Sequence, residues 1–374
     1  MMLIPGPVNV PSSVAKASDL VVNHRSQQFR DIVRESESLL NKFAGSDRAI
    51  MTTGSGTTAV ESMIFSLTSS GDDVGAVTFG EFGDRLIDSL HRRGLNVSTL
   101  NMTENDVLTE DDIKDFIVRN SRMKSLFLVQ NETGNGTSIH DMGRITMAAK
   151  NMGVRVFVDS VSAFGGVPIN VRDWGIDAVA TCSQKGLASV PGIGIVLLGE
   201  EMAGMVTPRD DIPQYLDLGI SLKFLSKNET PYTPSTGSFN ALREALRILE
   251  LEGLEKRWAR HHSNAEYLRK FLKLSKSEIL GNSNNYSDTV IAFRPRLPVK
   301  DTIAGLASRG ITVSRGMGKL ADSIIRVGNL GIVTGKDIQE FVNAYYEISG
   351  LSESNTEESI PPDSMPDPEI MHLF

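Results

Sequence analysis

The heptapeptide Thr181-Cys182-Ser183-Gln184-Lys185-Gly186-Leu187 carries the strongest indication of both fold and chemistry in this chain. It follows the apolar run 178–180, so Lys185 comes just after a predicted strand. Asp159 closes an earlier apolar run, residues 154–158. An acid that ends one strand and a lysine that follows the next are the pair that a pyridoxal 5'-phosphate (PLP) site needs. The lysine forms a Schiff base with the PLP aldehyde, and the carboxylate keeps the pyridine nitrogen protonated so that the ring accepts electrons.

Neither residue identifies such a site alone. Charged side chains are mostly exposed, an aspartate at a strand end commonly caps a turn, and a single lysine is commonly a solvated charge. The interpretation therefore depends on the sequence around the pair.

Short apolar runs alternate with helix-length segments from about residue 48 to 200. The expected strands are 49–52, 74–79, 96–100, 125–130, 154–159, 178–181 and 194–198. Expected helices include 57–69, 82–93 and 111–120. This alternation predicts an α/β fold with a mostly parallel seven-stranded sheet covered by helices on both faces. The last strands follow one another closely, which leaves room for at least one antiparallel strand.

The rest of the chain divides into recognisable parts. Residues 1–20 are punctuated by proline and are expected to be extended and to pack on a small domain. The large domain is expected over 21–250 and a small C-terminal α+β domain over 251–350. Residues 351–374 contain six acids, four prolines and neither lysine nor arginine, so we expect a flexible tail.

Composition narrows the function class. The chain has 374 residues, with 38 basic and 46 acidic ones giving a net charge of −8, which argues against nucleic acid or an anionic membrane as the main partner. Cys182 is the single cysteine, which precludes an intramolecular disulfide and fits a reducing compartment. No apolar stretch approaches the roughly 20 residues that span a bilayer, and Pro5 interrupts the N-terminal run too early for a signal peptide. A cytoplasmic protein is expected.

A small-residue turn, Thr53-Gly54-Ser55-Gly56-Thr57-Thr58, follows the first expected strand and opens a helix. Backbone N–H groups at the positive end of a helix, with added hydroxyl donors, form a good phosphate cradle. The run lacks the lysine of an NTPase phosphate loop, and Ala59 breaks the G-x-G-x-x-G spacing of a dinucleotide site.

Three further positions fit a cofactor and substrate site. Phe82 follows a strand, where an aromatic ring can lie flat on a cofactor ring. The run 130–136 offers short polar side chains for a ring oxygen, with Glu132 expected to be structural. Arg326 lies between apolar residues in a small-domain strand, from which an arginine can hold a carboxylate with two bonds or form an interdomain ion pair.

Taken together, these motifs resemble the class V aminotransferases of PLP fold type I, in the alanine–glyoxylate and serine–pyruvate group. The matches, in chain order, are Pro5-Gly6-Pro7 with Val10-Pro11; Asn23-His24-Arg25-Ser26 with Phe29; Gly54-Ser55-Gly56-Thr57; Phe82-Gly83-Asp84-Arg85; Glu132-Thr133-Gly134; Asp159-Ser160-Val161-Ser162 with Gly165-Gly166; Asp173-Trp174-Gly175-Ile176-Asp177; Gln184-Lys185-Gly186 with Pro191-Gly192; Tyr232-Thr233-Pro234; and Arg326-Val327-Gly328 with Leu330-Gly331. They extend over nearly the whole chain before the expected tail.

The resemblance implies a role for each matching position. Lys185 would link to PLP and carry the proton, and Asp159 would pair with the pyridine nitrogen. The remaining cofactor contacts would come from Gly56, Thr57, Thr58, Phe82, Thr133, Val161, Gln184, Tyr232 and Thr233. Thr233 would reach the phosphate of the other subunit, which implies a homodimer. Arg326 and Gly6 would contact the substrate. No metal is expected.

The implied reaction is a ping-pong transfer of an amino group from alanine or serine to glyoxylate or pyruvate. Aspartate, phosphoserine or 2-aminoethylphosphonate stay open as donors, since Arg25 and Arg315 offer a second anion contact. Asn329 and the run 187–191 depart from the family pattern and are expected at the substrate mouth. Alternatives are a PLP lyase or cysteine desulfurase, which would need Cys182 as a nucleophile, and a non-catalytic phosphate-binding module, which leaves Lys185 unexplained.

Overall fold

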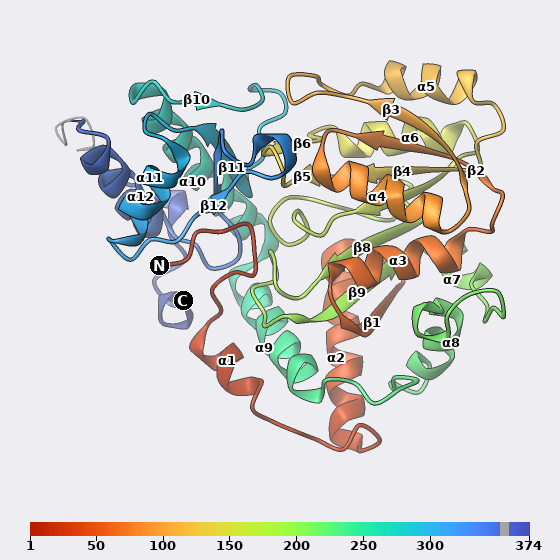
Figure 1. Ribbon diagram of the computed structural model, residues 1–374. Coiled ribbons are helices and arrows are strands. Elements are labelled where there is room, and N and C mark those ends of the chain that lie inside the picture. Colours follow the sequence, from red (N-terminus) through yellow and green to blue (C-terminus); the bar gives the residue numbers. More distant parts are fainter. Residues whose placement is uncertain (352–358) are drawn as a thin grey trace.

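The large sheet has seven strands in the order β1-β9-β8-β7-β4-β2-β3 (Figure 1). The computed structural model describes residues 1–351 and 359–374. The strands are β1 (Arg48–Gly54), β2 (Asp73–Thr78), β3 (Asn96–Asn101), β4 (Ser125–Val129), β7 (Arg155–Asp159), β8 (Ala178–Cys182) and β9 (Gly192–Leu198). Strands β3, β2, β4, β7 and β8 are parallel, whereas β9 runs antiparallel to both β8 and β1. The predicted mostly parallel seven-stranded sheet is confirmed.

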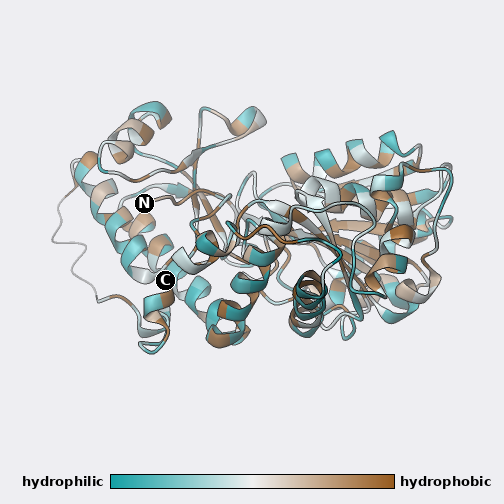
Figure 2. Cartoon of the chain, turned by 90° about the horizontal axis from the view of Figure 1, so that it is seen from below, coloured by the Kyte–Doolittle hydropathy of each residue, from teal (hydrophilic) through white to brown (hydrophobic). Residues whose placement is uncertain are grey.

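Helices cover both faces of this sheet. They are α2 (Gln27–Ala44), α3 (Gly56–Leu67), α4 (Glu81–Arg92), α5 (Glu110–Arg119), α6 (Met142–Asn151), α7 (Glu200–Met205), α8 (Leu218–Leu225) and α9 (Thr236–Glu252). Helix α3 lies against β8 and β9 and beside α4, while α2 and α9 pack together near β1 and β9. Figure 1 shows α3 and α4 on the near side of the sheet and α6 on the far side. In Figure 2 the strands are brown between helices whose outward residues are mostly teal.

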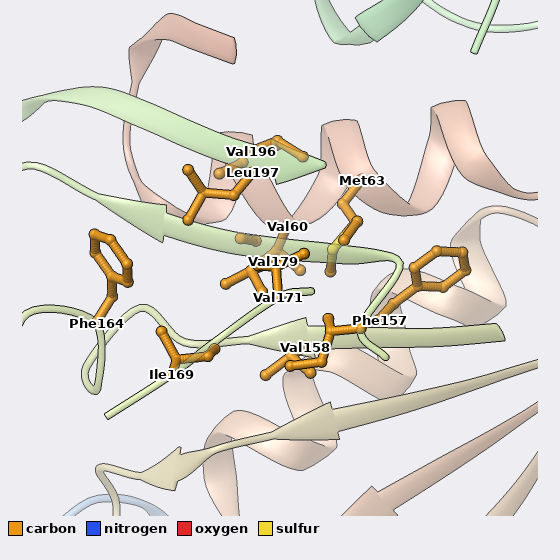
Figure 3. Close-up of a cluster of buried hydrophobic side chains, with 14 of the residues drawn as sticks. Val60, Met63, Phe157, Val158, Phe164, Ile169, Val171, Val179, Val196 and Leu197 are labelled. Carbon is orange, nitrogen blue, oxygen red and sulfur yellow. The ribbon is translucent and has the colours of Figure 1, made fainter. Parts of the chain in front are cut away.

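The core of the large domain joins the central strands to α3. Strands β4 and β8 are buried along their whole length, as expected for parallel strands with both faces covered. Figure 3 shows Val60 and Met63 of α3 in the same buried cluster as Val179 of β8 and Val196 of β9. This packing fixes the helix that begins at residue 56 relative to the strand that precedes Lys185.

A second core lies in the small domain. Gly253, with φ of 83°, separates α9 from α10 (Leu254–Leu274). The domain adds α11 (Val299–Ala307), α12 (Gly335–Ile348) and an antiparallel sheet ordered β10 (Glu278–Ile279), β11 (Val290–Arg294), β13 (Ile325–Gly328) and β12 (Ser314–Arg315). Leu3 is buried in this core, and its N–H donates to the carbonyl of Thr312 (2.8 Å). The N-terminal residues therefore bind to the small domain.

Two terminal segments differ from expectation. Residues Ser12–Ala17 form helix α1 rather than extended chain, and α1 packs on α9 of the large domain. Of the expected tail, residues 352–358 lie outside the described residues, but 359–374 pack on α10 instead of extending into solvent. Ser364 is fully buried there, and the ring centroid of Phe374 lies 5.0 Å from the guanidinium carbon of Arg260. This segment is held in place by contacts that its composition does not reveal.

Among the described residues, no helix has both the length and the apolar character needed to cross a membrane.

Candidate active site

Lys185 and Asp159 line one cavity of about 400 Å³ at the carboxyl ends of the parallel strands. Strand ends are where ligands bind in such sheets. The other predicted residues on its wall are Gly56, Thr57, Phe82, Thr133, Val161 and Gln184. Most of the predicted cofactor contacts are therefore brought together, although the chain supplies them from widely separated segments.

Asp159 is the last residue of β7 and is held in place by the next turn. Its Oδ1 accepts a hydrogen bond from the N–H of Val161 (2.9 Å). Burial raises the pKa of the Asp159 carboxyl to about 6, although the Val161 bond and the positive charges of Lys185 and Arg85 act in the opposite direction. A cation placed beside this carboxylate would be strongly favoured, because pairing offsets the cost of burying the charge.

Lys185 lies in a tight turn beyond β8 and is half-buried. Its Nζ donates to the carbonyl of Pro5 from the N-terminal segment. Gly6 is pressed against the same side chain, since a Cβ there would come within 2.5 Å of the Lys185 chain. Burial lowers the pKa of the Lys185 amine, and the charge of Arg326 lowers it further. A lowered pKa increases the neutral fraction, which is the nucleophilic form.

The turn at residues 54–58 caps α3 beside the cavity. The N–H of Ser55 donates to Oγ1 of Thr58 (3.1 Å) in a capping box. Thr58 is thus committed to the helix cap and does not line the cavity, whereas Gly56 and Thr57 do. A Cβ at Gly56 would come within 2.8 Å of Val161, so only glycine allows this close packing.

Thr133 belongs to a buried hydrogen-bonded cluster that sequence reasoning captured only in part. Its Oγ1 donates to Oγ of Ser162 (2.7 Å), and Nδ2 of Asn131 donates to the same oxygen (2.9 Å). Asn131 and Ser162 both line the cavity, and Oδ1 of Asn131 is buried without a partner in the described structure. Asn131 lies in the polar run 130–136, and Ser162 lies in the motif 159–162. Membership of these two motifs was the signal by which both residues could have been predicted.

Glu132 positions Phe82, in agreement with its expected structural role. Its carboxylate accepts hydrogen bonds from the N–H groups of Phe82 (3.0 Å), Gly83 (3.1 Å) and Gly134 (2.7 Å). These bonds join the first turn of α4 to the segment that carries Thr133. Burial raises the pKa of Glu132 to about 7 despite the three bonds.

Arg326 lies beside the cavity rather than on its wall. This side chain is buried and extends from β13 to the large domain, where Nη1 donates to the carbonyl of Thr133 (3.1 Å). Its Nε donates to the carbonyl of Arg315 (3.0 Å). The arginine thus links the two domains next to the cavity, through backbone carbonyls and not through the ion pair considered as an alternative.

Two predicted cofactor contacts lie elsewhere in this chain. Tyr232 and Thr233 are exposed and line a separate hollow with Tyr215, whose ring stacks on Tyr232 at a centroid distance of 5.6 Å. The Tyr215 hydroxyl donates to the carbonyl of Thr53 (2.6 Å). The loop is thereby anchored beside β1 and does not line the cavity of Lys185.

The residues proposed for substrate choice are also displaced from the cavity. Arg25 donates to Glu229 (2.7 Å), and Arg315 is exposed. Asn329 is fully buried, and its Nδ2 donates to the carbonyls of His261 (2.6 Å) and Asp288 (2.8 Å). Leu187, Ala188 and Ser189 are buried as well. Placing Asn329 and residues 187–189 at the substrate mouth was therefore wrong, because these side chains are buried inside the protein. Val190 is half-buried and Pro191 is exposed, and neither lines the cavity.

Cys182 is a packing residue. Its thiol is fully buried at the end of β8, and burial raises its pKa to about 12. A nucleophilic cysteine needs an accessible thiolate, so this position does not support desulfurase chemistry.

Comparison with known proteins shows the family of this chain. A family model described as aminotransferase class-V matches residues 12–330. The chain belongs to the class V aminotransferases. This aminotransferase is 30% identical over 347 residues to an uncharacterized aminotransferase of Methanocaldococcus jannaschii, covering 90% of this chain and 89% of the relative. It is 29% identical to an L-aspartate–glyoxylate aminotransferase of Paracoccus denitrificans, covering 89% and 87%.

Among solved structures, an alanine–glyoxylate aminotransferase from Nostoc sp. superposes on this aminotransferase with a TM-score of 0.87 at 28% identity. The match covers 93% of this chain and 94% of that chain. The fold is that of PLP fold type I, and the family implies an enzyme that uses PLP.

Proposed function

We propose that this aminotransferase transfers the amino group of a small amino acid to a 2-oxo acid, with glyoxylate as the preferred acceptor. The observation that carries the proposal is the shared cavity of Lys185 and Asp159, a half-buried amine and a buried acid at neighbouring strand ends. A non-catalytic phosphate-binding module would require neither group.

The residues around the cavity fit PLP. When bound, PLP supplies an aldehyde that links to an amine and a pyridine ring that accepts electrons. Phe82 and Val161 offer apolar surfaces for the two ring faces, and Asp159 offers a carboxylate for the ring nitrogen. The start of α3 at Gly56 and Thr57, with Gln184, offers donors for the phosphate, since helix N-termini favour anions.

Lys185 would act as the base and acid of the reaction. Its lowered pKa leaves the amine able to take the α-proton of the donor, and the same group then returns the proton. Buried Asp159 would keep the ring nitrogen positively charged. The 2-oxo acid formed from the donor leaves before the acceptor binds, which predicts ping-pong kinetics.

Arg326 would hold the α-carboxylate shared by donor and acceptor. A guanidinium binds a carboxylate through two parallel bonds, and this one is already fixed by the carbonyls of Thr133 and Arg315. Two relatives named above act on glyoxylate, with aspartate or alanine as donor, which supports the choice of acceptor. Alanine and serine are our first candidates for the donor, and aspartate is the alternative.

The active unit is proposed to be a homodimer. Tyr232 and Thr233 face a hollow outside their own cavity, and both are exposed enough to reach a neighbouring subunit. In a two-fold dimer each subunit would contribute this loop to the cofactor phosphate of the other.

The test starts from purified protein incubated with PLP. A visible absorbance band that borohydride bleaches, followed by mapping of the reduced pyridoxyl group to Lys185, is the expected result. Loss of labelling in Lys185→Ala is the control. Steady-state rates over alanine, serine and aspartate with glyoxylate or pyruvate then identify the substrates. Labelling elsewhere, or no band, would refute the proposal.

A further inference from the structure

The backbone turn that carries Lys185 is strained. The N–H of Ala188 closes the turn on the Lys185 carbonyl (2.9 Å), and Ala188 has φ of 54°, in the left-handed region. Gly186 lies so close to the Phe164 carbonyl that a Cβ would come within 2.3 Å of its oxygen. Backbone in such a conformation persists only where surrounding contacts fix it.

Arg257 of α10 supplies one of these contacts. Its side chain is 1% exposed, and Nη1 donates to the carbonyl of Gly186 (3.0 Å), the residue that follows Lys185. The Nε of Arg257 donates to Glu252, the last residue of α9. The buried carboxylate thus fixes the guanidinium, and the guanidinium fixes the Lys185 turn.

Arg260 provides a matched comparison within the same cluster. It lies on the same helix, is fully buried and donates through Nε to the other oxygen of Glu252 (2.8 Å). Its remaining donors, however, bind the carbonyls of Gly331 (2.9 Å) and Val333 in the small domain. Both arginines are buried and both donate to Glu252. They differ in the backbone carbonyls that they bind, which is Gly186 for Arg257 and Gly331 with Val333 for Arg260.

We propose that Arg257 is a positioning residue for Lys185. This inference rests on the proposed function, in which Lys185 links to PLP. Arg257 does not line the cavity. It acts by fixing Gly186, and so the Cα from which the Lys185 side chain extends towards the cofactor aldehyde. A lysine at position 257 cannot hold Glu252 and Gly186 together, because an ammonium lacks the fixed fork of a guanidinium.

The experiment compares cofactor-free wild type with Arg257→Lys, Arg257→Met and Arg260→Lys. Each protein is mixed with PLP, and the visible band is followed by stopped flow, with the linkage mapped to Lys185 after borohydride reduction. Wild type and Arg260→Lys should react at rates within about threefold of each other, whereas both Arg257 variants should be at least about tenfold slower. The pH at which the visible band titrates should move only in the Arg257 variants.

Thermal denaturation of the four proteins separates positioning from general stability. Arg257→Lys and Arg260→Lys should lose similar stability, because each loosens the same buried ion cluster. Equal reaction rates and equal band titrations in these two variants would overturn the role of Arg257, and this comparison decides the matter even if Arg257→Met does not fold. Failure of wild type to form the linkage at Lys185 would instead overturn the proposed function, and this inference with it.

Discussion

Oδ1 of Asp159 accepts a 2.9 Å hydrogen bond from the N–H of Val161, and the Val161 side chain in turn packs against Gly56 at the start of α3. One short turn thus fixes the acid, an apolar surface of the cavity and the distance of both to the start of α3.

Asp159→Asn should lower the turnover number by about a thousandfold, because a neutral amide does not stabilise a positively charged ring nitrogen. Cofactor affinity should fall as well. Asp159→Glu keeps the charge and should retain more activity than the amide. A rate for the Asn variant within about threefold of wild type would mean that Asp159 is not the partner of the ring nitrogen.

Arg326→Lys should raise KM for both donor and acceptor by at least about tenfold, because a point charge does not reproduce two parallel bonds to a carboxylate. The absorbance spectrum with PLP should hardly change. Amine donors without a carboxylate are the control. If they lose as much activity as amino acids do, Arg326 is only an interdomain link.

Glu132 should make the stability of the cofactor-free protein depend on pH. Its pKa is raised by burial from 4.5 to about 7, so between these values the folded state binds more protons than the unfolded state. The free energy of unfolding should therefore fall as pH rises from 4.5 to 7, with a contribution on the order of 3 kcal/mol from this residue. Urea unfolding of wild type and Glu132→Gln over this range measures the difference.

The variant should gain stability relative to wild type as pH rises, since its amide does not ionise. Glu200→Gln, at an exposed helix start, is the control for exchanging a carboxylate for an amide. Parallel curves for wild type and Glu132→Gln would show that Glu132 does not titrate in this window.

Cys182→Ala should keep most of the transaminase activity, at a cost of about 1–2 kcal/mol in stability for the lost packing. Because burial raises the pKa of the thiol to about 12, iodoacetamide should not label native protein near neutral pH but should label it in urea. Loss of turnover in a folded Ala variant would contradict the packing role.

Mixing inactive subunits should restore activity if the loop with Tyr232 and Thr233 serves the neighbouring site. Lys185→Ala is combined with a Tyr232→Ala, Thr233→Ala double variant. One site of each mixed dimer then carries both defects and the other carries none. At equal amounts about half of the dimers are mixed, so total activity should approach about a quarter of wild type. No recovery after confirmed subunit exchange would assign the loop to its own chain's site.

The sequence predicted the large sheet because its strands are short buried apolar runs, and the site because its residues follow those runs at the carboxyl ends. Lys185 and Asp159 come together because they follow the neighbouring parallel strands β8 and β7. Residues 192–198 form β9, which is antiparallel to β8. The short connection after β8 had left room for this antiparallel strand.

Other features depend on partners that lie far apart in the chain. In the sequence, Arg257 and Glu252 look like ordinary charged residues of amphipathic helices. In the folded protein they are buried and form an ion pair. Asn329 departed from a motif, yet its amide binds two carbonyls in the small domain. Residues 359–374 looked solvated by composition and are ordered by contact with α10.

The pairing of β1 with β9 also bears on how the protein is made. Arg48 lies opposite Leu198 in the register, so within the described residues the first strand of this sheet pairs only with β9, the last strand of the same sheet to be synthesised. Until then Ile50 and Met51, buried in the finished sheet, have no strand to cover them. Pairing over so long a stretch of chain is slow and leaves apolar surface exposed. Nascent chains should therefore leave the edge of β1 unpaired until β9 has been synthesised.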